Sequence, residues 1–143
     1  MNPSIAYLGP PGTYTEAATL AYADSLQQSQ GFSCHLTPKA TIAQTLQAAA
    51  AGEVAYAVVP VENSIEGGVT VTLDTLWQLD RLQIHQALVL PITHSLISRA
   101  SNWEKITKVY SHPQALAQCQ GWLAKQLPQA ELVATQSTSE AVL

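Results

Sequence analysis

One pattern recurs along this chain: a short apolar run ends, and a helix start follows within a few residues. The spacing Ser/Thr-x-x-Glu/Gln is typical of a capping box, in which side chains satisfy the first backbone N–H groups of a helix. We interpret three of its instances as capping boxes at helix starts: Thr13–Glu16, Thr41–Gln44 and Ser137–Glu140. A chain that alternates strands and helices in this way is predicted to form an α/β fold with mostly parallel sheets.

The apolar runs set the order of the predicted elements. Strands are predicted at 4–8, 33–36, 55–61, 108–110 and 132–134, and helices at 17–28, from 41 to about 52, up to 79 and at 113–127. The run at 55–61 is almost unbroken apolar, which is typical of a strand buried on both faces of a sheet.

A longer β-like stretch, 82–98, exceeds the usual strand length of about 5–6 residues. We interpret it as a strand that leaves one domain and enters another. The chain is therefore predicted to contain a first α/β lobe at 1–80, then a crossover strand and a second α/β lobe at 81–143.

Composition excludes several classes of protein. Charged residues make up 11% of the chain and apolar residues 47%, against about 25% charged residues in typical domains, which excludes disorder. A net charge of −4 with scattered Lys and Arg argues against nucleic acid as a partner. No run approaches the ~18–20 apolar residues of a membrane span, and the first residues lack a signal-peptide pattern. We expect a soluble, cytoplasmic protein with Cys34 and Cys119 reduced.

Four loops each follow a predicted strand and precede a predicted helix; they lie at 9–15, 62–68, 111–114 and 135–138. In open parallel sheets, ligands bind beyond the carboxyl ends of the strands. A helix start offers unpaired N–H groups and about half a positive charge. One such loop is weak evidence, because Ser and Thr cap most helices for structural reasons. The four together predict a site for an anion, most simply a metabolite that carries carboxylates.

Glu62, Asn63 and Ser64 directly follow the run at 55–61. An amide donor and a hydroxyl at a strand end are suited to holding an oxyanion or a departing hydroxyl group. A turn in which Asn tolerates an unusual backbone angle explains the same residues without a function. The loop at 9–15 lacks the Gly-Lys-Ser/Thr of a Walker A loop, which argues against nucleotide binding.

The helix predicted at 113–127 has a polar face that begins at the preceding loop. Ser111, Gln114 and Gln118 fall on this face, which is either turned into the crevice or solvated. The neighbouring apolar stripe, which should belong to the core, comprises Leu116, Cys119 and Leu123.

The histidines show neither i, i+4 pairs nor cysteine partners, so no metal site is predicted. His94 lies in an apolar stretch and is expected to be a hydrogen-bonded, partly buried group. His112 either caps the helix or contacts an anion. The tryptophans are interpreted as packing residues; they are Trp77, Trp103 and Trp122.

Together these motifs resemble the prephenate dehydratase family, in the family's order and over nearly the whole chain. The matching segments are Gly9-Pro-Pro-Gly-Thr-Tyr-Thr-Glu16, Val59-Pro-Val-Glu-Asn-Ser-Ile-Glu-Gly-Gly-Val69, His94-Ser-Leu96, Ser111-His-Pro-Gln-Ala-Leu-Ala-Gln-Cys119 with Trp122-Leu123, and Ser137-Thr-Ser-Glu-Ala141. The resemblance implies a two-lobed fold like that of type II periplasmic binding proteins. It also implies conversion of prephenate to phenylpyruvate without a cofactor, with loss of carbon dioxide and water, in phenylalanine biosynthesis.

By resemblance, four residues match the family's active-site positions: Glu62, Asn63, Ser111 and Gln118. Asn63 and Gln118 would orient the substrate, Ser111 would contact a carboxylate or the hydroxyl, and Glu62 would orient the others. The loops add further candidates for substrate binding, namely Gly12, Thr13, Ser64, Gly67, Gly68, His112 and Gln114.

The family also carries a Thr-Arg-Phe motif and a regulatory ACT domain beyond the position that matches Leu143. We therefore expect the second lobe to be truncated, the first to lack its returning strand, and these residues alone to have little or no activity. Unpaired sheet edges would favour a homo-oligomer. Two alternatives stay open: an arogenate dehydratase, and a non-catalytic module of the same fold that binds a small anion.

Overall fold

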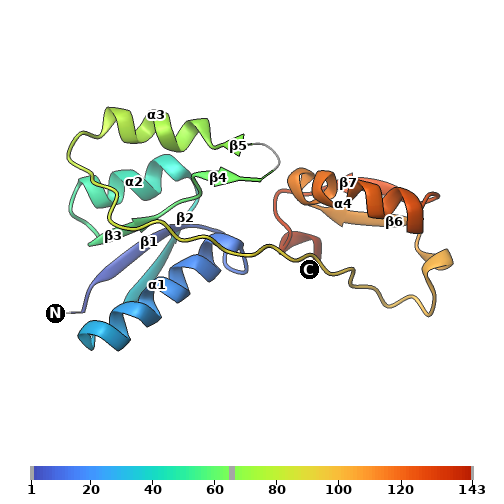
Figure 1. Ribbon diagram of the computed structural model, residues 1–143, viewed down its shortest axis with the longest axis horizontal. Helices are drawn as coiled ribbons and strands as arrows, with labels where there is room; N and C mark the ends of the chain where they lie inside the picture. The colour runs from blue at the N-terminus through green and yellow to red at the C-terminus, as the bar shows by residue number, and fades with distance from the viewer. Residues whose placement is uncertain (1, 65–66, 143) are drawn as a thin grey trace. The chain divides into compact units, whose positions relative to one another are not determined.

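The computed structural model describes residues 2–64 and 67–142. The chain divides into two compact units, Met1–Leu90 (unit 1) and Pro91–Leu143 (unit 2). Both are α/β units (Figure 1). The division falls inside the long β-like stretch, ten residues after the expected end of the first lobe at 80.

Unit 1 is built on a parallel sheet with the strand order β2-β1-β3. These strands are β1 (Ser4–Leu8), β2 (His35–Lys39) and β3 (Tyr56–Val58). Helix α1 covers one face of the sheet, α2 covers the other, and α3 packs on α2 (Figure 1). The bounds are Tyr14–Gln30 for α1, Ile42–Ala50 for α2 and Thr70–Gln78 for α3. The parallel sheet predicted from the alternating pattern is confirmed.

The central strand β1 is the buried one. Ile5 and Ala6 have no exposed surface, and Ile5 packs with Tyr22 and Leu26 of α1. The prediction that the strand at 55–61 is buried on both faces is wrong, because β3 is only half-buried. Its pairing explains the difference: within residues 2–64 and 67–142, β3 pairs with β1 alone, whereas β1 has a neighbour on each side.

The predicted caps start the first two helices. The Thr13 hydroxyl accepts from the Glu16 N–H at 3.3 Å, and the Thr41 hydroxyl accepts from the Gln44 N–H at 3.1 Å. Strand β2 begins two residues later than predicted, because Ser33 donates its N–H to the Asn2 side chain and ladder pairing starts at His35.

The sequence predicted that the loop at 62–68 opens a helix directly, and this prediction is wrong. The loop contains a short antiparallel hairpin of β4 (Glu62–Asn63) and β5 (Gly67–Gly68). Residues 65 and 66 of this segment lie outside the described residues. Helix α3 follows with Val69 as its N-cap, which makes no side-chain capping bond. Instead, the buried Thr72 hydroxyl donates to the Pro60 carbonyl at 2.7 Å and ties α3 to the end of β3.

The expected crossover strand at 82–98 is not a strand. Its backbone enters no ladder and stays irregular from Leu82 to Ala100. Several apolar side chains along it are exposed, among them Val89 by 93% and Ile84 by 74%. The β propensity of this run is real, but a strand requires a hydrogen-bonded neighbour, and the described residues supply none.

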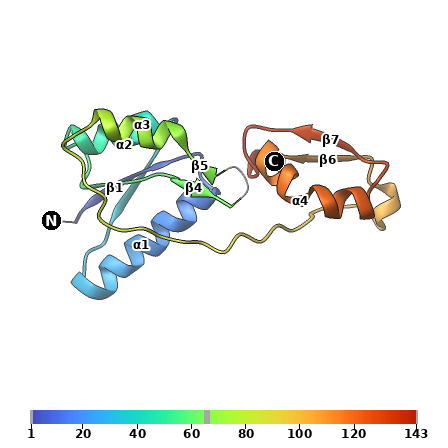
Figure 2. The ribbon, with the colours of Figure 1, turned by 45° about the horizontal axis from the view of Figure 1, so that its top comes forward.

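Unit 2 has a parallel strand pair covered by one helix (Figure 2). Its elements are β6 (Lys108–Ser111), β7 (Glu131–Ala134), α4 (Pro113–Gln126) and two 3-10 turns, η1 (Trp103–Lys105) and η2 (Glu140–Val142). The predicted apolar stripe is confirmed: Leu123 belongs to the core with Ile106, Val109 and Leu127, and Leu116 and Cys119 pack against it.

The third predicted cap forms, but it opens a 3-10 turn rather than an α-helix. The Glu140 N–H donates to the Ser137 hydroxyl at 3.0 Å. The tryptophans divide between two environments. The rings of Trp103 and Trp122 lie 5.2 Å apart, as packing residues would, whereas Trp77 is 90% exposed and its predicted packing role is wrong for the described residues.

Candidate functional site

In unit 1, the loop after β1 is held by one carboxylate. Glu16 accepts from the Gly12 N–H at 2.6 Å and from the Tyr7 hydroxyl at 2.8 Å. These bonds stabilise its charged form, so the pKa of Glu16 is lowered, first by Gly12 and then by Tyr7. Burial and the neighbouring Glu16 raise the pKa of Tyr7 to about 12. The N–H that Gly12 would offer to an anion is thus engaged by the protein itself, and Thr13 caps α1.

The second loop of unit 1 brings four candidates together in one hairpin. Glu62 faces Gly68 across the hairpin, and Asn63 faces Gly67. Asn63 is half-buried, while Glu62 and Ser64 on either side are exposed. Gly67 has a φ of 79°, a backbone conformation that strains residues with a side chain and therefore favours glycine at this position. Asn63 is therefore the least exposed of these three polar residues.

In unit 2, the functional candidates gather where β6 ends and α4 begins. The Ser111 carbonyl accepts at 2.9 Å from the N–H of Thr135, the residue directly after the neighbouring strand β7, and this bond fixes the end of β6. His112 is the N-cap of α4: its Nδ1 accepts from the Gln114 N–H at 3.2 Å. The capping role, one of the two left open for His112, is confirmed, and Pro113 occupies the first helical position as predicted.

About one and a half turns into α4, the Gln118 side chain has a partner outside the predicted site. Its Oε1 lies 2.5 Å from Nε2 of His94, and both side chains are half-buried. The expectation that His94 is a hydrogen-bonded, partly buried group is confirmed. Sequence reasoning did not include His94 in the site, although its position as a polar ring in an apolar stretch was a usable signal.

The fourth loop repeats the arrangement of the first. Glu140 accepts from the Gln136 N–H at 2.7 Å, as Glu16 does from Gly12, and each donor lies four residues before its glutamate. Ser137 and Ser139 share a hydrogen bond of 3.1 Å. In both loops, a backbone N–H group before the helix is thus already hydrogen-bonded to a glutamate of the same segment.

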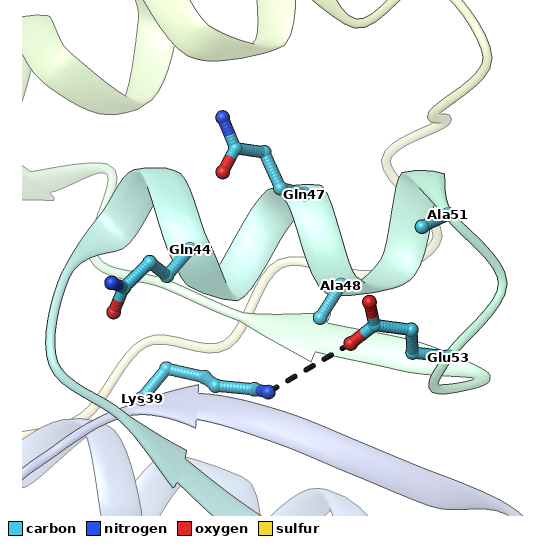
Figure 3. A pocket seen from close by; sticks show the side chains of 6 residues that line it. All are labelled: Lys39, Gln44, Gln47, Ala48, Ala51 and Glu53. Atoms are coloured by element: carbon cyan, nitrogen blue, oxygen red, sulfur yellow. Dashed lines mark ion pairs between the residues drawn. The ribbon is translucent and has the colours of Figure 1, made fainter.

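A hollow of about 460 Å³ lies elsewhere in unit 1, along helix α2 (Figure 3). Lys39 and Glu53 form an ion pair in it, with 3.9 Å between Nζ of Lys39 and Oε2 of Glu53. The other side chains that line it are Gln44, Gln47, Ala48 and Ala51. None of the predicted site residues lines this hollow, so it does not coincide with the strand-end loops.

Residues 2–64 and 67–142 contain neither a candidate metal site nor a candidate membrane-spanning helix. No group of three or more His, Cys, Asp or Glu side chains there could hold a metal ion. No helix there is both long and apolar enough to cross a membrane.

Parallel strands, helix starts at their carboxyl ends and a division into two α/β units are the features of the periplasmic-binding-protein-like class, to which this fold belongs. A family model described as prephenate dehydratase matches residues 5–143. The chain belongs to the prephenate dehydratase family.

Relatives of known name agree with the family model. The chain is 42% identical over 137 residues to a bifunctional chorismate mutase/prephenate dehydratase of Aquifex aeolicus. This match covers 96% of this chain and 36% of that protein. It is 39% identical to a prephenate dehydratase of Lactococcus lactis subsp. cremoris, again over 96% of this chain and over 46% of that protein.

Solved structures give the same result. The crystal structure of prephenate dehydratase in complex with L-Phe from Arthrobacter aurescens matches with a TM-score of 0.75 and 34% identity, over 97% of this chain and 44% of that one. The enzyme from Staphylococcus aureus matches with a TM-score of 0.70 and 26% identity, over 99% of this chain and 50% of that one. The chain thus spans between about a third and a half of the length of these relatives.

Proposed function

We propose that this chain provides active-site residues of a prephenate dehydratase, a carbon–oxygen lyase that converts prephenate to phenylpyruvate. Membership of the family over residues 5–143 is the observation that carries the proposal. In this reaction the ring carboxylate leaves as carbon dioxide and the ring hydroxyl leaves as water, so that the product becomes aromatic. The substrate is a small molecule with two carboxylates, and no cofactor is required.

The chemistry asks two things of the protein. The departing hydroxyl needs a proton or a strong hydrogen bond, and the ring carboxylate must be oriented so that both groups leave together. We assign orientation and hydrogen bonding to the amides of Asn63 and Gln118, contact with a carboxylate or the hydroxyl to Ser111, and positioning of the others to Glu62. The half-burial of Asn63, Ser111 and Gln118 supports these roles, because a partly desolvated donor binds an anion more strongly.

The proposal extends to location and assembly. We place the protein in the cytoplasm, with which its two free cysteines are compatible. We also propose a homo-oligomer, because β2 and β3 each pair on one side only among the described residues and leave edges that a second copy can extend. Light scattering coupled to size-exclusion chromatography measures this state directly.

The test is a turnover assay. We would incubate the 143-residue chain with prephenate and follow phenylpyruvate by its absorbance in alkali. In parallel, this chain would replace the matched segment of the Lactococcus lactis enzyme, with arogenate as a second substrate. Turnover of prephenate in either form supports the proposal, and turnover of arogenate alone would reassign the substrate. If both forms fold and bind a small anion but turn over neither substrate, the non-catalytic module is the correct function.

Variants connect the activity to the assigned residues. We expect Asn63→Ala and Gln118→Ala each to lower turnover at least tenfold, since each removes a hydrogen-bonding group from the substrate. The matched control is Gln120→Ala, which truncates an exposed glutamine on the same helix and should stay within twofold of the unaltered protein. Turnover within twofold for both site variants would contradict the assignment.

A further inference from the structure

We propose that His94 is a positioning residue that fixes the orientation of the Gln118 amide. The inference rests on the proposed function, in which Gln118 contacts the substrate. It starts from one contact in unit 2: Nε2 of His94 meets Oε1 of Gln118, although 24 residues separate them in sequence. His94 comes from the irregular segment 82–100, and Gln118 comes from the interior of helix α4.

The chemistry of the two groups determines which way the amide faces. A glutamine amide presents an acceptor at one end and two donors at the other, and rotation about its last bond exchanges them. The Gln118 oxygen can only accept, so Nε2 of His94 carries the proton and donates it. With its oxygen held by His94, the amide turns its NH2 group away from His94. A donor held in this way suits a carboxylate or a departing hydroxyl.

The contact also restricts the side chain. A long, flexible glutamine loses rotamer freedom when it is held, and a group already held need not be ordered when substrate arrives. Both neutral imidazole protonated on Nε2 and imidazolium can donate this bond, so the orientation is the same in either state. His94 thereby acts on substrate through Gln118 and need not touch it.

The first test examines the bond in the 143-residue chain, whether or not that chain is active. The 15N signals of the His94 ring report which nitrogen carries the proton. We expect Nε2 to be protonated, and we expect its signal to shift in Gln118→Leu. An unprotonated Nε2, or a signal that ignores Gln118→Leu, would overturn the inference.

The second test measures kcat and KM for prephenate in the form that is active, either the chain or the segment replacement. We expect His94→Leu to lower kcat/KM about tenfold through the loss of one hydrogen bond at the site. His94→Gln places an amide N–H near the position of Nε2 and should recover most of this loss, whereas the shorter His94→Asn should not.

A double-variant cycle separates positioning from a general structural role. In a Gln118→Ala background, His94→Leu should cost less than a further twofold, because the group it positions is already absent. Additive losses would show that His94 acts independently of Gln118 and would overturn the inference alone. An unaltered protein that turns over no prephenate would instead overturn the proposed function, while the ring-nitrogen measurement still decides whether the bond exists.

Discussion

One carboxylate, that of Glu16, holds the loop after β1 and makes the folding stability of the protein depend on pH. Its pKa is lowered below the usual 4.5 by the Gly12 N–H and the Tyr7 hydroxyl. A group whose pKa is lower in the folded state adds stability above its unfolded pKa and loses it as pH falls through the folded value. The contribution of Glu16 is therefore present at neutral pH and disappears in acid.

We expect the difference in unfolding free energy between the unaltered chain and Glu16→Gln to stay constant above about pH 5 and to shrink below pH 4.5. Urea denaturation from pH 7 to pH 3 measures this difference. If the two proteins keep the same separation throughout the acid range, the loop does not depend on the charge of Glu16.

Two buried tyrosines allow a matched pair of changes. The Tyr7 hydroxyl donates to Glu16, whereas the Tyr22 hydroxyl is buried with no hydrogen-bond partner among the described residues. Removal of an unsatisfied hydroxyl relieves a desolvation cost, and removal of a bonded one leaves its partner short. Tyr22→Phe should raise the free energy of unfolding by up to ~1 kcal/mol, and Tyr7→Phe should lower it by about 1 kcal/mol. Thermal and urea denaturation of both variants measure these changes in unfolding free energy. Changes of the same sign in the two variants would contradict the prediction.

Two glycines, one in the loop after β1 and one inside α4, should respond oppositely to the same substitution. A Cβ on Gly9 would lie 3.1 Å from Cβ of Pro38 and 3.3 Å from the Lys39 carbonyl oxygen, where neither a proline ring nor a backbone can easily yield. Gly121 lies in the interior of α4, with nothing within 4 Å of its added carbon.

We expect Gly9→Ala to lower the free energy of unfolding by roughly 1–3 kcal/mol through overpacking. Gly121→Ala should raise it by about 0.5–1 kcal/mol, because alanine restricts the unfolded chain and favours the helix. Denaturation curves for the two variants provide the measurement. A stabilised Gly9→Ala would show that the end of β2 can move away from this loop.

At the scale of elements, sequence patterns succeeded where the cause is local. The hydroxyl caps at Thr13, Thr41 and Ser137 are within reach of their own helices, so spacing alone predicts them. Sequence patterns failed where strand pairing determines the structure. The burial of β3 depends on how many neighbours it has, and the stretch at 82–98 has β propensity without a ladder partner.

The candidate site shows the same limit. The start of α4 at Pro113 and the capping by His112 follow from adjacent residues and were foreseeable. The contact between His94 and Gln118 joins residues 24 positions apart, and no local pattern specifies it. Likewise, the hairpin that sets Asn63 opposite Gly67 arises from strand pairing, whereas the sequence predicted a helix start there.

For the whole molecule, the two units and their connection make proteolysis informative. Arg81 and Arg99 are exposed and flank the segment that enters no ladder or helix. The four lysines, in contrast, lie in strands, a helix or a 3-10 turn; they are Lys39, Lys105, Lys108 and Lys125. Proteases cut most readily where the backbone is not held by secondary structure.

Brief trypsin digestion should therefore cut first after Arg81 and Arg99 and leave the fragments 1–81 and 100–143, identified by mass. A double variant, Arg81→Gln with Arg99→Gln, should survive the same treatment severalfold longer. A first cut after Lys39 or Lys125 would mean that β2 or α4 opens more easily than the connection.

The indole rings of Trp103 and Trp122, tilted by 58° at a centroid distance of 5.2 Å, form a chiral pair of chromophores. Electronic transitions of two aromatic rings this close couple with each other, and circular dichroism records such coupling as an exciton couplet of paired opposite signs. One ring comes from η1 and the other from α4, so the couplet exists only while those two elements are packed together. Unit 2 therefore carries its own optical reporter, which can follow its assembly without a label.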